Sequence, residues 1–242
     1  GLRSPHLGRH FADHYGVRPG SILASEELGY RRITDQETAV MPVLAPSPSA
    51  LDRTGRQNVC LMLDPDPGNA SLPTPYARNA ALGFLPREFL NYRAQMIVEP
   101  RPTPDSRITL TDARCELGLR RARLDWLLDP RDVESALGFF NELSNLLAQT
   151  GQGRARQTYQ ASAAQLASAM GANHHLGTLR FSRDPKDGVT DADGRLHDMD
   201  NLYVLSSALF PRYGYSNPTL TLVALAARLA SRWSAQAPEA QP

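Results

Sequence analysis

The clearest periodic pattern in the chain lies between residues 133 and 148, where apolar side chains recur every three or four positions. The positions with this spacing are Val133, Ala136, Leu137, Phe140, Leu143, Leu146 and Leu147. The spacing places them along one face of a helix. Asp129 or Asp132 is suited to cap the start of this helix, and Gly151 is suited to end it. We predict that the apolar face packs against a sheet.

Several shorter segments have the composition of strands. Residues 58–63 form a largely apolar run between proline-rich loops, and residues 122–128 place Ala122, Leu124, Trp126 and Leu128 at alternate positions. A turn at Gly118 would pair residues 122–128 with residues 108–111 as a hairpin. The apolar run at residues 201–205 predicts a buried strand near the C-terminus. Strands and helix together predict an α+β fold, in which an antiparallel sheet packs with helices.

A second helix is predicted to begin at Asn217-Pro218, because Asn is a favoured N-cap and Pro is favoured at the first helical position. Apolar positions continue the helical spacing at Leu220, Val223, Ala224, Ala227 and Ala230. The start of a helix presents unpaired N–H groups and a partial positive charge. An anionic group would therefore be stabilised in front of this helix.

The composition excludes several classes of partner. Hydrophobic residues make up 41% of the 242 positions and the formal net charge is +1, so no strong basic character indicates a nucleic acid or an anionic membrane surface. No apolar run approaches the roughly 20 residues that cross a bilayer. Two cysteines are too few for a disulfide framework. We expect a bacterial, cytoplasmic protein without a membrane span.

The start of the chain carries no signal-peptide pattern. It begins at Gly1 rather than at a methionine, so we expect a processed or truncated product, with any targeting signal upstream.

Metal sites are not predicted. Asp187, Asp191 and Asp193 precede Gly194 as in a calcium-binding loop, but no Glu follows at the position that such a loop needs. Turn formation explains these aspartates better. His10 and His14 are four residues apart but have no nearby Cys or Glu at a ligand spacing.

The segment His174-His175-Leu176-Gly177-Thr178 contains the side chains best suited to proton transfer. A neutral imidazole accepts a proton near neutral pH, as the oxidation of an alcohol by hydride transfer requires, and a cofactor must then accept the hydride. Adjacent side chains diverge, so we favour His174 over His175 as the base. A metal-dependent hydrolase that uses both histidines is an alternative reading.

Four segments resemble the carboxy-terminal half of the glucose-methanol-choline (GMC) oxidoreductases. They are the His-x-x-Gly-Thr pattern at residues 174–178, Asn201-Leu202-Tyr203-Val204, Ser216-Asn217-Pro218-Thr219-Leu220-Thr221 and the Gly-Arg-x-x-x-x-His pattern at residues 8–14. The family consists of FAD-dependent enzymes that oxidise the CH-OH group of an alcohol or sugar. The resemblance implies that His174 is the catalytic base.

The same resemblance implies further site residues. Asn217 falls at the family's second catalytic position, where its amide would hold the substrate oxygen near the base. Asn217, Pro218 and Thr219 would lie against the flavin ring. Ser206 and Ser207 would lie near the phosphate and ribityl part of FAD.

The Gly-x-Gly-x-x-Gly turn by which the family's Rossmann-type domain binds FAD is missing from this chain. We expect that domain to be a separate chain or to have been removed. Residues 1–20 would follow it, 21–165 would form the substrate-binding domain, 166–235 would return to the FAD domain as a catalytic segment, and 236–242 would be a flexible tail. A non-catalytic binding or scaffold subunit derived from the family is the alternative function.

Overall fold

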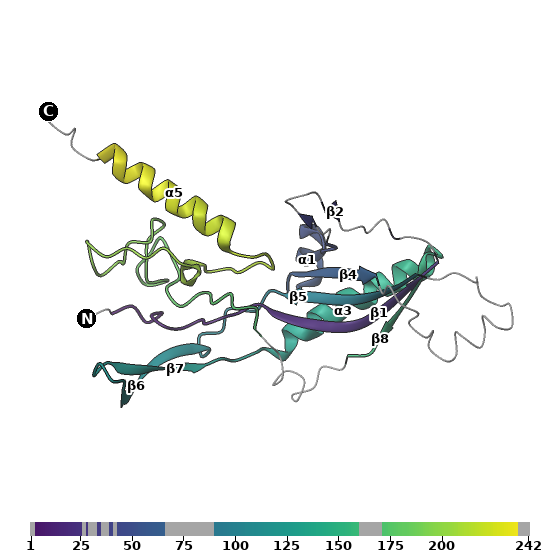
Figure 1. Ribbon diagram of the computed structural model, residues 1–242, viewed down its shortest axis with the longest axis horizontal. Coiled ribbons are helices and arrows are strands. Elements are labelled where there is room, and N and C mark those ends of the chain that lie inside the picture. Colours follow the sequence, from purple (N-terminus) through teal and green to yellow (C-terminus); the bar gives the residue numbers. More distant parts are fainter. Residues whose placement is uncertain are drawn as a thin grey trace. The chain divides into compact units, whose positions relative to one another are not determined.

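The computed structural model describes residues 3–25, 28, 33–34, 39–40, 43–65, 90–159 and 171–236 (Figure 1). Internal contacts divide the chain into two units. The first unit comprises Gly1–His14, Pro100–Leu128 and Gly171–Pro242, and the second comprises Tyr15–Glu99 and Asp129–Met170. Each unit is assembled from separate segments of the sequence, whereas the boundaries expected at residues 20, 165 and 235 divide the chain into consecutive domains. The boundary at residue 165 and the expected tail beyond Gln236 lie outside the described residues.

The second unit contains an antiparallel sheet of four strands in the order β4-β5-β1-β8. The strands are β1 (Tyr15–Ala24), β4 (Val59–Pro65), β5 (Leu90–Val98) and β8 (Gly153–Gln157). Strand β4 confirms the strand predicted at residues 58–63. The unit also contains α1 (Pro48–Thr54) and the short pair β2 (Ile33–Thr34) and β3 (Ala39–Val40).

Helix α3 (Pro130–Gln149) confirms the strongest prediction from the sequence. The Asp129 side chain caps it by accepting a hydrogen bond from the Arg131 backbone N–H, 2.9 Å away. Val133, Ala136 and Phe140 on its apolar face are fully buried, and the helix contacts β8, β1 and β5. Helix and sheet together establish the predicted α+β fold.

The first unit contains the predicted hairpin, formed by β6 (Arg107–Arg114) and β7 (Arg120–Asp125). Gly118 in its turn has φ 73°, a left-handed conformation that glycine adopts without a steric penalty. The apolar side chains of the hairpin are largely open to solvent, since Leu110 is 58% and Leu124 is 48% exposed.

The core of the first unit is formed by segments from both ends of the chain. Its buried members are Ala12, Leu176, Leu209, Phe210 and Tyr213. Leu222 and Leu225 of helix α5 (Thr219–Gln236) pack against this cluster, as does the short 3-10 helix η1 (Ser207–Leu209) that carries Leu209. Within the described ranges, no helix combines the length and apolar character needed to cross a membrane.

The strand predicted at residues 201–205 is wrong. This segment makes a single isolated bridge, between Tyr203 and Arg195, and Leu202 and Leu205 are 40% and 45% exposed. A strand needs a neighbour that stays alongside it for several residues. Here the chain leaves its neighbour after one bridge and enters η1 at Ser207.

Candidate active site

Asp13 fixes the loop that carries His174. The residue is 3% exposed, and its carboxylate accepts hydrogen bonds from three successive backbone N–H groups: those of Ala172 (3.2 Å), Asn173 (3.1 Å) and His174 (2.8 Å). Asn173 has φ 61°, so the chain turns sharply just before His174. Hydrogen bonds to a charged acceptor are among the stronger ones in proteins. The position of the His174 backbone is therefore set by a residue 161 positions away in sequence.

His14 holds the imidazole of His174. The Nδ1 atoms of the two rings are 3.0 Å apart, and the rings meet edge to face. On its other side, Nε2 of His14 lies 2.9 Å from the carbonyl oxygen of Gly214. His14 is completely buried, and burial lowers its pKa below the ordinary value of 6.5, with a further lowering from His174. His14 is therefore neutral at neutral pH.

His175 points away from this pair. Its side chain is 66% exposed, its Nε2 atom is 4.0 Å from the Asp13 carboxylate, and its ring contacts that of Phe11. The two adjacent imidazoles thus have different surroundings. Only the His174 imidazole hydrogen-bonds to His14.

Asn217, Pro218 and Thr219 lie at the start of α5. The prediction that Asn217 caps the helix is wrong by one residue, because the carbonyl of Pro218 accepts the first helical hydrogen bond, from the Leu222 N–H at 3.0 Å. The fixed φ of proline suits either position, so the sequence alone does not decide between them. Asn217 is exposed and Pro218 is buried. His14 connects this region to His174, since the carbonyl it binds belongs to Gly214, three residues before Asn217.

Ser206 and Ser207 lie beside the same loop. The Ser207 hydroxyl donates to the carbonyl of His175 at 2.5 Å, and the Ser206 hydroxyl accepts from the Ala208 N–H at 3.0 Å as the cap of η1. The backbone of η1 also accepts from the Leu179 N–H. The predicted site residues at 174, 206 and 207 therefore gather in one part of the first unit.

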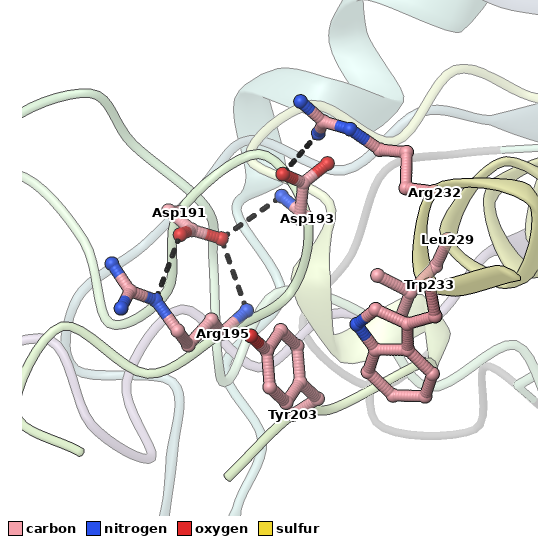
Figure 2. A pocket seen from close by; sticks show the side chains of 7 residues that line it. All are labelled: Asp191, Asp193, Arg195, Tyr203, Leu229, Arg232 and Trp233. Carbon is pink, nitrogen blue, oxygen red and sulfur yellow. Dashed lines mark hydrogen bonds and ion pairs between the residues drawn. The ribbon is translucent and has the colours of Figure 1, made fainter. Parts of the chain in front are cut away.

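A separate hollow of about 210 Å³ lies between α5 and the loop at residues 191–203 (Figure 2). It is lined by Asp191, Asp193, Arg195, Tyr203, Leu229, Arg232 and Trp233. The Asp191 side chain accepts from the backbone N–H groups of Asp193 and Arg195, which confirms the predicted turn chemistry. Asp193 pairs with Arg232, and the rings of Tyr203 and Trp233 meet edge to face. These contacts attach α5 to the loop.

The sequence reasoning missed the roles of Asp13 and His14. His14 belongs to the Gly-Arg-x-x-x-x-His pattern, which marked the segment but not its contact with His174. The contacting residues are about 160 positions apart, so no local pattern reveals the pair.

Residues 102–226, more than half of the chain, match the family described as GMC oxidoreductase. The 6'''-hydroxyparomomycin C oxidase of Streptomyces lividus is 32% identical over 169 residues, covering 69% of this chain and 30% of that protein. Paromamine 6'-oxidase of Streptomyces fradiae is 32% identical over 144 residues, covering 59% of this chain and 25% of that protein. The crystal structure of pyridoxine 4-oxidase from Mesorbium loti is 22% identical and covers 95% of this chain and 44% of its own, with a TM-score of 0.49.

The chain thus spans less than a third of the length of these two curated relatives. The matched segment contains the His174 loop, η1 and the first turns of α5. This chain therefore belongs to the GMC oxidoreductase family.

Proposed function

We propose that this chain is the substrate-binding and catalytic half of an FAD-dependent oxidoreductase that oxidises the CH-OH group of an alcohol or sugar. The observation that carries the proposal is the arrangement of His174, whose backbone is held by Asp13 and whose ring is held by a neutral, buried His14. Groups that act as bases gain from such fixed orientation, because little reorganisation is then needed when the proton moves.

In the proposed reaction, the imidazole of His174 accepts the proton of the substrate hydroxyl. The C–H bond at the same carbon breaks with its electron pair, so that a carbonyl forms. When bound, FAD supplies the acceptor for that hydride. The amide of Asn217 would hold the substrate oxygen. Two relatives of this chain are named as oxidases of paromamine and of a hydroxyparomomycin, which supports a hydroxyl of a sugar as the reacting group.

The start of α5 suits a negatively polarised part of the cofactor. The helix is 18 residues long and has no acidic residue in its first turn, so its N-terminal N–H groups are not compensated by a carboxylate of their own helix. Asn217 and Thr219 at this end are exposed. We assign Asn217, Pro218 and Thr219 to the flavin ring and Ser206 and Ser207 to the rest of FAD.

The exposed face of α5 supports a partner domain. Leu222 and Leu225 pack inward, whereas Leu220 is 82% and Val223 is 61% exposed on the other side of the helix. Burying large apolar side chains is favourable by about 1.5 to 3 kcal/mol each. We propose that the FAD-binding domain, in the same polypeptide or in another chain, covers this face.

The experiment that tests the class of function uses the complete protein with its FAD-binding domain. Anaerobic addition of alcohols and sugars should bleach the flavin absorbance near its visible maximum and yield the matching carbonyl product. A non-catalytic scaffold would bind no flavin, or would keep its flavin oxidised with every substrate in the panel. Either of these results would overturn the proposal.

A further inference from the structure

The hydrogen bonds of His14 determine which of its nitrogens carries the proton. A carbonyl oxygen only accepts, so the Nε2 atom that lies 2.9 Å from the Gly214 oxygen must be the donor. A neutral imidazole has one N–H group, which leaves Nδ1 of His14 as an acceptor. Complete burial keeps His14 neutral, consistent with its lowered pKa.

The tautomer of His174 follows from that of His14. Its Nδ1 atom lies 3.0 Å from Nδ1 of His14, which carries a lone pair in that tautomer, and two nitrogens with facing lone pairs at this distance would repel each other. Nδ1 of His174 must therefore carry a proton. The reverse arrangement would direct a lone pair of His14 at the Gly214 carbonyl, or would require a charged His14 in full burial.

We propose that His14 is a positioning residue that holds His174 in the tautomer with a proton on Nδ1 and a lone pair on Nε2. The proposal deepens the function proposed above and rests on it for its catalytic meaning. A His174 ring in this tautomer is ready to accept the substrate proton at Nε2. After that transfer, Nδ1–H still donates to His14, now from a charged ring, so the bond strengthens without rearrangement.

The carboxylate of Asp13 is a charged group beside the pair. It accepts the backbone N–H of His174, and it raises the pKa of His14 only as a minor opposing effect. Asp13 therefore fixes the backbone of the residue whose ring His14 orients.

Two substitutions of His14 separate its two hydrogen bonds. In His14→Asn, the amide oxygen takes the place of Nδ1, so the acceptor for His174 remains and the donor to Gly214 is lost. In His14→Gln, the amide nitrogen reaches the place of Nε2, so the donor to Gly214 remains and the acceptor is lost. Both variants replace the ring by an amide, which makes them matched controls for stability.

The direct measurement is the nitrogen-15 NMR spectrum of the complete FAD-loaded protein with labelled histidine, with the His174 signals assigned by their loss in His174→Ala. We expect a protonated Nδ1 and an unprotonated Nε2 for His174 in the unsubstituted protein. We expect the same tautomer in His14→Asn, and a mixed or reversed tautomer in His14→Gln. The rate of flavin reduction should fall about 10²-fold further in His14→Gln than in His14→Asn.

A protonated Nε2 on His174 in the unsubstituted protein would overturn the inference, even if neither variant folds. So would equal tautomers and equal reduction rates in the two variants. These outcomes are distinct from a failure of the proposed function, which would appear as normal flavin reduction in His174→Ala whatever the tautomer.

Discussion

Replacing Asp13 by Asn should loosen the loop that carries His174. The two side chains have nearly the same size, but Asn offers one acceptor oxygen in place of two. In the best orientation, that oxygen keeps the hydrogen bonds from the N–H groups of Ala172 and His174, both of which now go to Oδ1. The amide nitrogen then faces the N–H group of Asn173, which now donates to Oδ2.

The cost follows from these three contacts. The part-buried N–H group of Asn173 loses its partner, which costs about 1 to 3 kcal/mol. The two remaining bonds change from a charged to a neutral acceptor and weaken by about 1 kcal/mol each. The sum is about 4 kcal/mol, and at about 1.4 kcal/mol for each factor of ten it corresponds to an opening of the loop that is roughly a thousandfold more frequent.

Hydrogen exchange of the complete protein, followed by mass spectrometry on a peptide that spans residues 171–176, measures this opening. Asp13→Asn should lose about three orders of magnitude of protection there. The control is Asp112→Asn on β6, whose fully exposed side chain pairs with Arg120 and which should leave the peptide unchanged. Protection within tenfold of the unsubstituted protein would refute the role assigned to Asp13.

Two further predictions concern stability. Gly177→Ala should destabilise the protein by at least about 3 kcal/mol in thermal unfolding, because φ is 85° and a Cβ atom would lie 2.3 Å from the His10 carbonyl oxygen. Gly55→Ala, at φ 62° with no atom within 4 Å of the added Cβ, should cost only about 1 to 2 kcal/mol, and equal costs would contradict the steric argument. Burial, and secondarily Arg180, lowers the pKa of His10 from 6.5 to about 4. Between pH 6.5 and 4, His10 is therefore protonated in the unfolded chain and neutral in the folded chain. The free energy of unfolding should fall by about 3 kcal/mol as the pH falls across this range. Urea titrations at several pH values should show a smaller loss in His10→Asn, and an identical loss would exclude His10 as the cause.

The local spacing of apolar, capping and turn residues predicted the elements whose formation depends mainly on their own sequence. Helix α3 has a capping Asp129 and an apolar face that is buried over most of its length, as both signals predicted, although Leu146 is 55% exposed. The β6–β7 hairpin was predictable from a short alternation and a glycine turn. These features need no knowledge of distant segments.

The errors arise where distant segments decide the outcome. Helix α5 was predicted from the stripe that includes Leu220 and Val223, but that stripe is exposed and the opposite face, with Leu222 and Leu225, packs on the core. Both faces are apolar, so periodicity predicts the helix but not which face is buried. Residues 201–205 have the composition of a strand but lack a continuous neighbour.

The candidate site was predictable in part. The family resemblance pointed to His174, Asn217 and the serines at 206 and 207, and the structure bonds Ser207 to the carbonyl of His175, next to His174. The family resemblance could not indicate that Asp13 and His14 hold the His174 loop, because those contacts join residues about 160 positions apart in the sequence. The geometry of an acid–base group depends on such contacts as much as on the group itself.

The central claim, that His174 is the base, is tested most directly by the rate of anaerobic flavin reduction in the complete protein. His174→Ala should retain bound FAD but lower this rate by about 10² to 10⁴-fold, the usual contribution of a general base. His175→Ala, which changes the exposed neighbouring imidazole, should reduce its flavin at close to the unsubstituted rate. Near-normal reduction in His174→Ala, or an equal loss in both variants, would contradict the account.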